Sequence, residues 1–496
     1  METSHDLVGL PLYRCDDARA IDAAAIAGGT PAFELMTRAG TAAFACLRQR
    51  WPHGQRLGVL CGAGNNGGDG YVVARLARAV GMDVRLAALA PAGPEPAKRA
   101  AAEWVAAGGR IEAPDSLAWL GDCDVLIDAL FGIGLSRGAV GEGARLIDAI
   151  NASDVPVLAL DVPSGLDADH GRAQGACVRA TRTLSFITAK RGLYTGRARD
   201  WCGVLDVADL DVAATAFAQR APCAQRFTPE ALRRWLPPRA RAAHKGAHGH
   251  VLAIGGDHGY AGAIRLCAEG ALRVGAGLVS VGTRAEHVAA MLVARPEAMV
   301  QAVEDADALR AFAARADVLA LGPGLGQSAW GRECWETALT LDRPLVLDAD
   351  ALNLLARAPR ALSDAVLTPH PGEAARLLET SVAQIEADRF AAVEALAARY
   401  ASVVVLKGAG TLVAGPRRLT AVIDAGNPGM ASGGMGDVLT GVIAGLRAQG
   451  LDAFDAACAG ALLHAAAGDA AAQEGGERGM LASDLFSYLR RGANPA

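Results

Sequence analysis

The stretch Asn427-Pro-Gly-Met-Ala-Ser-Gly-Gly-Met-Gly-Asp-Val-Leu-Thr-Gly441 decides how we interpret the second half of the chain. It places one carboxylate, Asp437, between a run of glycines and an apolar stretch with helical spacing. Glycines let the backbone approach a ligand, and a helix N-terminus offers unpaired N–H groups to an anion. An Asp there can accept a proton from a hydroxyl group while the N–H groups hold a phosphate. The stretch lacks the Lys-Ser/Thr ending of a P-loop, so it predicts either another phosphoryl-transfer apparatus or only a glycine-rich turn capped by an Asp.

Length and composition predict a globular protein of two to three domains. The chain has 496 residues, 52% of them hydrophobic and 20% charged, with a net charge of −5 and both signs interspersed. This balance indicates no nucleic-acid-binding face. The ten cysteines are scattered without a Cys-x-x-Cys pair, which indicates reduced thiols. No apolar run reaches the ~18 residues of a membrane span, and the N-terminus lacks a signal peptide's apolar core, so we expect a cytoplasmic protein with no membrane partner.

Apolar runs alternate with alanine-rich, helix-compatible stretches in two blocks, which predicts an α/β protein with two parallel sheets covered on both faces. The segment between the blocks, residues 221–243, is rich in proline and arginine and is interpreted as a connector with a short helix over 230–235. We therefore place the domain boundary near residue 222, between domains 1–222 and 223–496. The expected strands are 57–61, 84–89, 125–127, 155–161 and 183–187 in the first block, and 251–255, 318–321, 345–347, 365–367 and 403–406 in the second.

A glycine-rich loop follows the first strand of the first half. Strand 57–61 leads into Gly62-Ala-Gly-Asn-Asn-Gly-Gly-Asp-Gly70, and a helix is expected from Tyr71. Strand, glycine loop and helix form the context in which such a loop binds phosphate. The third glycine falls too early for the dinucleotide fingerprint, and Asp69 could hold a ribose hydroxyl. Asn-Asn-Gly-Gly could also be a simple turn.

Two further motifs place an Asp at the carboxyl end of a strand, where parallel sheets build their sites. They are Asp128-Ala-Leu-Phe-Gly-Ile-Gly-Leu-Ser-Arg137 and Asp161-Val-Pro-Ser-Gly-Leu-Asp167. Each Asp could singly be a helix cap. Asn66, Asp128 and Ser164 together make capping alone a poor explanation, and their oxygens suit a hard cation rather than zinc.

Together these three motifs resemble the NAD(P)H-hydrate epimerase family over residues 12–210, including Thr183-Leu-Ser-Phe-Ile-Thr-Ala-Lys-Arg-Gly-Leu193. The resemblance implies that Asn66, Asp128 and Ser164 bind a potassium ion and that Asp161 is catalytic, facing the nicotinamide ring. Lys190 lies in a matching motif, and a solvated lysine beside the site is the alternative. The implied contacts to the damaged dinucleotide are Asn65, Asn66, Gly67, Gly68, Asp69, Gly132, Ile133, Gly134, Leu135, Ser136, Arg137, Gly138 and Asp161.

The second half carries further motifs at its strand ends. They are Gly255-Gly-Asp-His-Gly-Tyr-Ala-Gly-Ala263, Gly322-Pro-Gly-Leu-Gly326, Asp348-Ala-Asp-Ala-Leu-Asn353, Thr368-Pro-His-Pro-Gly-Glu373 and Lys407-Gly-Ala-Gly-Thr411. His370 could be a locally bonded turn histidine, and Lys407 suits a nucleotide contact or a lysine extending into solvent at a strand end. The spacing of His244, His248 and His250 fits neither a zinc helix nor a zinc loop.

The order of these motifs resembles the ADP- or ATP-dependent NAD(P)H-hydrate dehydratases, a branch of the ribokinase-like fold, over residues 227–489. The resemblance implies a ribokinase-like α/β/α second domain beside a Rossmann-like first domain. The residues implied to face the hydrated cofactor are Ala263, Gly324, Gly326, His370 and the catalytic base Asp437. The residues implied to hold the adenine nucleotide are Lys407, Gly408, Ala409, Gly410, Thr411 and Gly436.

The two resemblances together imply a bifunctional repair enzyme for hydrated NADH and NADPH (NADHX and NADPHX). The first half would interconvert the R and S forms, and the second would dehydrate the S form at the expense of ADP, with Mg²⁺, giving AMP and phosphate. We expect a homo-oligomer. Two alternatives stay open: the second half could be a kinase for a vitamin-like alcohol, and the first a non-catalytic dinucleotide-binding module.

Overall fold

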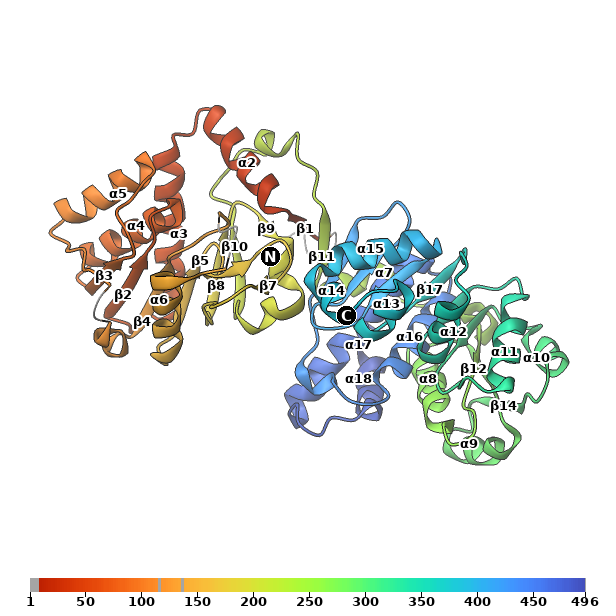
Figure 1. Cartoon of the computed structure of the whole chain (residues 1–496). Helices are drawn as coiled ribbons and strands as arrows, with labels where there is room; N and C mark the ends of the chain where they lie inside the picture. The colour runs from red at the N-terminus through yellow and green to blue at the C-terminus, as the bar shows by residue number, and fades with distance from the viewer. Residues whose placement is uncertain (1–8, 115–116, 135–137, 496) are drawn as a thin grey trace. The chain divides into compact units, whose positions relative to one another are not determined.

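The computed structural model describes residues 9–114, 117–134 and 138–495. It divides into two compact units, one formed by residues 11–224 and the other by residues 9–10 together with 225–495. Figure 1 shows both as sheets flanked by helices. The ten cysteines are all free within this described part of the chain. None of the described helices combines the length and the apolar character needed to cross a bilayer.

The first unit is built on a six-stranded sheet in which all pairs are parallel, in the order β10-β8-β5-β4-β2-β3. Two short strands, β6 and β7, form a separate antiparallel pair, and β1 pairs with β9 in parallel. The strands are β1 (Leu10–Tyr13), β2 (Arg56–Cys61), β3 (Asp83–Ala88), β4 (Val125–Ala129), β5 (Val157–Leu160), β6 (Leu166–Asp167), β7 (Arg172–Ala173), β8 (Arg182–Phe186), β9 (Ala189–Lys190) and β10 (Val204–Ala208). The helices are α2 (Cys15–Ala27), α3 (Ala32–Arg50), α4 (Asn65–Ala79), α5 (Glu95–Ala106) and α6 (Gly141–Ala152).

Helices cover both faces of this sheet. Neighbouring residues of its central strands point to opposite faces and pack in two different hydrophobic clusters. Val59 of β2 and Ile127 of β4 pack in a cluster with α3, α4 and α5. Leu60 and Leu126, their neighbours in sequence, pack in another cluster that includes Leu146 of α6. Continuous apolar runs therefore form central strands buried on both sides, as the sequence predicts.

The second unit is built on a sheet whose order runs β14-β13-β12-β15-β16-β17-β18-β19-β20-β11. Its pairs are parallel from β14 to β18, whereas β19 pairs antiparallel with both β18 and β20, so the expectation of a purely parallel sheet is wrong at this end. The strands are β11 (Ala224–Phe227), β12 (His250–Ile254), β13 (Leu278–Thr283), β14 (Met299–Ala302), β15 (Val318–Leu321), β16 (Leu345–Leu347), β17 (Ala365–Leu367), β18 (Val403–Leu406), β19 (Leu412–Ala414) and β20 (Thr420–Ile423). The helices are α7 (Leu232–Trp235), α8 (Ala261–Arg273), α9 (Val288–Ala294), α10 (Ala306–Ala313), α11 (Ala329–Leu339), α12 (Ala349–Arg357), α13 (Pro371–Leu377), α14 (Val382–Ala387), α15 (Arg389–Tyr400), α16 (Met435–Ala448), α17 (Ala453–Gly475) and α18 (Leu485–Gly492).

Helix α16, which begins inside the stretch quoted first, packs closely on α8. A Cβ atom on Gly441 would lie 1.8 Å from the carbonyl oxygen of Cys267, and one on Gly270 would lie 2.6 Å from that of Val438. Only glycine permits such contact between helix backbones. These glycines therefore fix where the first turn of α16 lies.

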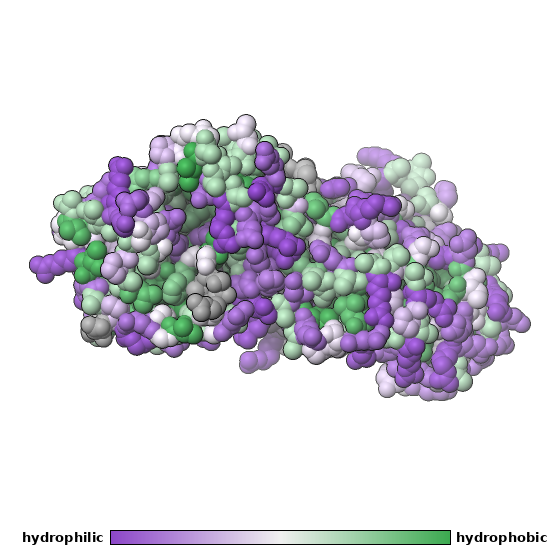
Figure 2. All heavy atoms as spheres, turned by 45° about the horizontal axis from the view of Figure 1, so that its top comes forward, coloured by the Kyte–Doolittle hydropathy of each residue, from purple (hydrophilic) through white to green (hydrophobic). Residues whose placement is uncertain are grey.

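Part of the segment predicted as a connector, residues 221–243, belongs to the hydrophobic core of the second unit. It contains strand β11 and helix α7, and Phe227 and Trp235 are buried, with ring centroids 5.0 Å apart. Proline and arginine dominate its composition, but a few large apolar residues decide its packing. On the molecular face drawn in Figure 2, hydrophilic and hydrophobic residues are interspersed, in agreement with the mixed charge of the sequence.

Candidate active sites

The glycine-rich motif of the first unit begins a helix rather than forming an extended loop. Helix α4 starts at Asn65, six residues before the expected start at Tyr71. The glycines permit this early start: a Cβ atom on Gly67 would lie 1.9 Å from the carbonyl oxygen of Gly62, and one on Gly70 would lie 2.7 Å from the Cβ of Ala129. The helix N-terminus is thereby brought against the carboxyl ends of β2 and β4.

A cavity of about 540 Å³ lies at this edge of the first sheet. Its wall also includes Asp22 of α2, which the sequence analysis missed because that helix carries no glycine motif. Gly67, Gly68 and Gly138 are not on this wall, and Leu135, Ser136 and Arg137 lie outside the described residues. The predicted substrate-binding residues that line the cavity are Asn65, Asn66, Asp69, Gly132, Ile133, Gly134 and Asp161.

Asp161 is held in the cavity wall by Lys190. The Nζ atom of Lys190 lies 2.5 Å from Oδ1 of Asp161 and also donates to the Ser185 hydroxyl and the Phe186 carbonyl oxygen. Lys190 is only 1% exposed, so the alternative of a solvated lysine is wrong. Asp161 has a φ angle of 64°, a left-handed conformation that non-glycine residues rarely adopt. Such strain is retained where the position of a side chain matters.

Asp69 and Asp22 add two further carboxyl groups to this wall. Burial and the nearby charges of Asp161 and Asp22 raise the pKa of Asp69 well above its usual range. Burial and the charge of Asp161 also raise the pKa of Asp22. The cavity thus contains one carboxylate paired with an ammonium ion and two carboxyl groups whose pKa values burial raises.

Two of the three predicted potassium ligands are in direct contact. The Ser164 hydroxyl donates to Oδ1 of Asp128 at 2.6 Å, and the Ser164 N–H donates to Oδ2 at 2.8 Å. Burial raises the pKa of Asp128 to about 6, although these hydrogen bonds oppose the shift. Asn66 is also buried, and neither of its amide atoms has a hydrogen-bond partner among the described residues.

In the second unit the motifs gather at the carboxyl ends of β12, β15, β16, β17 and β18. Gly324 has a positive φ, and a Cβ atom on it would lie 3.2 Å from the Cβ of Ala263. The Gly326 N–H donates to Asp350 Oδ2 at 2.9 Å. Ala263, Gly324 and Gly326, all predicted to face the substrate, therefore form one wall together with Asp350, which the sequence analysis had not assigned.

Asp437 lies in the first turn of α16. Gly434 precedes the helix with a φ of 89°, and a Cβ atom on Gly433 would meet nothing within 4 Å, so the backbone is open there. Burial and the charges of Asp348 and Glu373 raise the pKa of Asp437 to about 7, against the opposing effect of Lys407. A carboxyl group with a pKa near neutrality is suited to accept a proton in the physiological range.

His370 and Lys407 flank this position. His370 caps α13: its Nδ1 accepts from the Gly372 N–H, while the backbone N–H of His370 donates to the Glu373 carboxylate, and the side chain stays half exposed. The local bonding that the sequence suggests for His370 is therefore present, and its exposed side chain can still contact a ligand. Lys407, directly after β18, donates to Asp348 at 2.7 Å.

The histidines 244, 248 and 250 do not form a metal centre, and the described residues contain no group of three His, Cys, Asp or Glu side chains placed to hold a metal ion. His250 is buried in β12 and bonds to Ser280 and to the Arg315 carbonyl oxygen.

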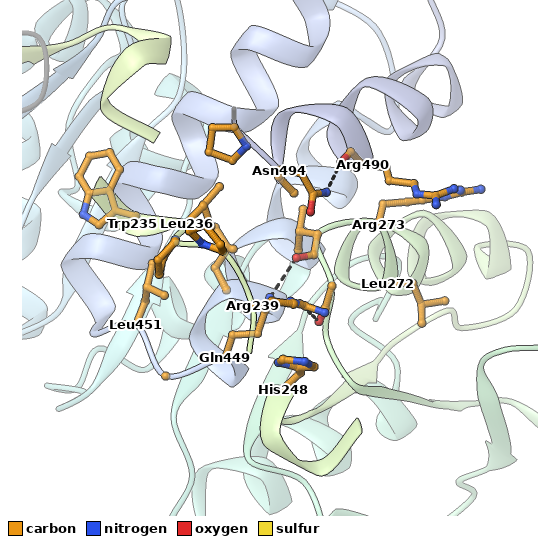
Figure 3. A pocket seen from close by; sticks show the side chains of 18 of the residues that line it. Trp235, Leu236, Arg239, His248, Leu272, Arg273, Gln449, Leu451, Arg490 and Asn494 are labelled. Carbon is orange, nitrogen blue, oxygen red and sulfur yellow. Dashed lines mark hydrogen bonds between the residues drawn. The ribbon is translucent and has the colours of Figure 1, made fainter. Parts of the chain in front are cut away.

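A cavity of about 1260 Å³ in the second unit lies away from these motifs (Figure 3). His248 and Gly275 in its wall precede β12 and β13, so it lies at the amino ends of the parallel strands. Arg239 bonds to Gln449 across it. None of the predicted site residues lines it.

Comparisons with known proteins agree with this division. A family model described as NAD(P)H-hydrate dehydratase matches residues 251–491, and one described as YjeF-related protein N-terminus matches residues 32–192. The bifunctional NAD(P)H-hydrate repair enzyme Nnr of Escherichia coli is 49% identical, over 97% of this chain and 94% of its own. That of Coxiella burnetii is 47% identical, over 98% and 99%. A solved ribokinase-like superfamily protein from Enterococcus faecalis is 29% identical, with a TM-score of 0.51, over 54% of this chain and 96% of its own.

Proposed function

The chain belongs to the family of bifunctional NAD(P)H-hydrate repair enzymes, and we propose that its two units perform the two reactions at the sites described above. The first unit epimerises hydrated NADH and NADPH, and the second dehydrates the S form with ADP as the phosphoryl donor. The observation that carries the proposal is the position of Asp437: a carboxyl group with a pKa of about 7 in the first turn of α16, beside an open glycine backbone and Lys407.

In the second unit, Asp437 accepts the proton of the C6 hydroxyl group as its oxygen attacks the β-phosphorus of ADP. An O–P bond forms, the bond to the AMP oxygen breaks, and AMP leaves with that electron pair. Phosphate then leaves C6 with the C–O electron pair, and a proton leaves C5, which restores the double bond. Phosphorylation is required because hydroxide is a poor leaving group.

The protein's contribution is to hold the phosphates while this proton moves. The N–H groups at the start of α16 and the Lys407 ammonium ion supply positive charge where the phosphoryl group arrives. Residues 408–411 follow Lys407, with Gly408 and Gly410 at positive φ, so their backbone can approach the nucleotide closely. Ala263, Gly324, Gly326 and His370 border the space for the hydrated ring.

The residues around Asp437 fit a Mg²⁺ ion only if the phosphates of the bound nucleotide supply most of its ligands. No cage of three ligating side chains exists among the described residues, and Mg²⁺ is often held largely by substrate phosphates. When bound there it would neutralise phosphate charge during transfer.

In the first unit, the residues present fit a potassium ion. Asn66 has a buried amide oxygen without a partner, and Asp128 and Ser164 place further oxygens in contact with each other. A weak field of neutral and singly charged oxygens suits a large monovalent cation. Bound at Asn66, Asp128 and Ser164, the ion would compensate the buried Asp128 charge and orient the substrate.

Epimerisation can proceed by ring opening, because C6 carries both a hydroxyl group and the ring nitrogen N1. A base accepts the hydroxyl proton, the O–H electron pair forms a C=O bond, and the C6–N1 bond breaks with its electron pair and a donated proton going to N1. Ring closure on the other face of the C=O group reverses these steps. Asp161, fixed by Lys190, lies in the same wall as Asp22 and Asp69, two carboxyl groups whose pKa values burial raises. We assign proton acceptance to Asp161.

The test is to incubate the protein with mixed hydrate epimers and ADP and to follow the absorbance of reduced nicotinamide. Full conversion of both epimers is expected, with AMP and phosphate as products in equal amounts. If the second unit were instead a kinase for a vitamin-like alcohol, a stable phosphorylated product would accumulate and no reduced nicotinamide would form. The homo-oligomer, the cytoplasmic location and the boundary at residue 222 stay predictions.

A further inference from the structure

An ion pair between the partly exposed Lys407 and the buried Asp348 lies directly beneath the first turn of α16. Lys407 Nζ is 2.7 Å from Asp348 Oδ1, and Asp348 is only 2% exposed. A Cβ atom on Gly436, the residue before Asp437, would lie 3.1 Å from Lys407 Nζ and 3.3 Å from Asp348 Oδ2. The ammonium ion therefore lies at the helix N-terminus, next to the residue that carries the base.

Asp348 is tied to α16 by a second contact. The Thr440 hydroxyl, one turn after Gly436, lies 3.0 Å from Asp348 Oδ2 and 3.0 Å from the carbonyl oxygen of Gly436. Asp348 itself follows strand β16, and Lys407 follows β18. One carboxylate thus joins two strand ends to the helix and leaves the lysine little freedom of position.

The charges around this pair do not balance. Three carboxyl groups, Asp348, Glu373 and Asp437, surround the single ammonium ion of Lys407, with Glu373 at 3.9 Å from its Nζ. Burial raises the pKa of Glu373. Burial opposes ionisation of Asp348, but the Lys407 charge and the hydrogen bonds from Lys407, Thr368 and Thr440 together lower the pKa of Asp348. Burial would lower the pKa of Lys407, but the Asp348 and Glu373 charges raise it.

Other ionisable groups face the cluster from the surrounding helices. Arg376 of α13 adds a positive charge, and the N-terminus of α13 adds a partial one. Burial together with the Lys407 charge lowers the pKa of His370, which caps this helix. Burial lowers the pKa of His464 of α17 to about 4 and raises that of Cys267 of α8, so both are neutral near pH 7. The buried guanidinium group of Arg389 binds the carbonyl oxygen of Lys407.

We propose that Asp348 is a positioning residue of the dehydration reaction, because it fixes Lys407 Nζ under Gly436. The ammonium ion is thereby held next to the transferred phosphoryl group and the base Asp437, and away from the adenosine end of the nucleotide. The proposal rests on the dehydratase function proposed above. Stability alone explains this pair poorly, because the desolvation of the buried Asp348 charge offsets much of its attraction to Lys407.

The test is the pH dependence of kcat in the full-length variant Asp348→Asn. With the Asp348 charge removed, Glu373 and Asp437 still keep Lys407 charged near neutrality, so Asp437 loses a repulsive neighbour and ionises more easily. The acid limb of the profile is expected to move to lower pH by about one unit or more. The alkaline limb is expected to move down as well, because Lys407 loses its closest partner.

The variant Lys407→Met is expected to shift the acid limb of the pH profile in the opposite direction. This second measurement keeps the test valid even if Asp348→Asn does not fold. Removing the cation that contacts Asp348 should move the acid limb to higher pH by about one unit or more. In the double variant the two charges are removed together, so its acid limb should return close to the wild-type position while kcat stays low.

Glu269→Gln is the matched control. Glu269 is equally buried, at 2% exposure, and is paired with Arg273 and Arg295 in the same unit, but it lies in the wall of the cavity at the amino ends of the strands. The substitution Glu269→Gln is expected to lower the stability of the second unit and to leave both limbs of the pH profile of kcat unchanged.

Unchanged limbs in Asp348→Asn and Lys407→Met, with activity lost only in proportion to folded protein, would overturn the assignment. Shifts of the same sign in both variants would overturn it too. Failure of the wild-type protein to dehydrate hydrated NADH would instead refute the proposed function, so the two failures are distinguished by the wild-type rate.

Discussion

Replacing Asp437 by asparagine should make the second unit more stable while it removes dehydration. The structure holds this carboxyl group where burial, Asp348 and Glu373 oppose its ionisation, and its pKa rises from 3.8 to about 7. At 1.36 kcal/mol per pKa unit, a shift of this size destabilises the fold by up to about 4 kcal/mol when the group is fully ionised. Asparagine has nearly the same shape and no charge, so it relieves this cost.

The size of this stabilisation depends on pH, because the wild-type carboxyl group titrates and the asparagine side chain does not. Because the folded-state pKa is raised above the unfolded value, the folded state binds the proton more tightly. Its stability relative to the unfolded chain is therefore greatest below the unfolded pKa and falls as pH rises through about 7. The gain from Asp437→Asn should be near zero at about pH 4 and reach its full size by about pH 8.

Urea unfolding of the full chain, followed through the transition of the second unit, measures this gain at both pH values. The same protein, assayed with saturating ADP, should lose about 10²–10⁴-fold in dehydration rate and keep its epimerisation rate. A variant that is less stable than wild type near pH 8, or a gain of equal size at both pH values, would refute the electrostatic reasoning. A loss of dehydration below about tenfold would refute the assignment of Asp437 as the base.

Three further results are expected. Replacing potassium by a bulky organic cation should weaken epimerisation or its substrate binding, and indifference to the cation would reduce Asn66, Asp128 and Ser164 to turn and capping groups. Asp161→Asn should lower epimerisation by about 10²–10⁴-fold and leave dehydration of the S form intact, which a kinetic assay on the separated epimers would show. Fragments 1–222 and 223–496, expressed apart, should each keep their own reaction; the second should convert about half of an equal epimer mixture quickly, and adding the first should remove the lag. Equally fast use of both epimers by the second fragment would contradict two separate sites.

Buried strands were the features most accurately predicted from sequence. The runs 318–321, 345–347, 365–367 and 403–406 are strands with those same bounds in the structure. Each is a continuous apolar run that ends at a glycine, aspartate, threonine or lysine of a motif, so the burial and the end are both visible locally. Strands β11, β19 and β20 were not predicted, although they are no shorter than these four. Strand β11 contains Gln225 and Arg226, so it is not a continuous apolar run.

The candidate sites were predicted to the extent that they consist of contiguous motifs. Asn66, Asp161 and Asp437 all lie where strand and helix ends meet, as their motifs indicate. Asp22 was missed, since an aspartate in an alanine-rich helix gives no local signal that the helix borders a cavity. The pairing of Lys190 with Asp161 and of Lys407 with Asp348 joins residues 29 and 59 positions apart, so it depends on strand order, which no local pattern specifies.

Gly9 and Leu10 belong to the same compact unit as residues 225–495, and a Cβ atom on Gly9 would lie only 2.9 Å from the ring of Phe227. The second unit is therefore not one continuous piece of chain. During synthesis, residues 11–224 can fold as soon as they leave the ribosome, whereas Gly9 and Leu10, made before them, must wait for a partner made after them. Gly9 and Leu10 are thus made before residues 11–224 but reach their final place after them.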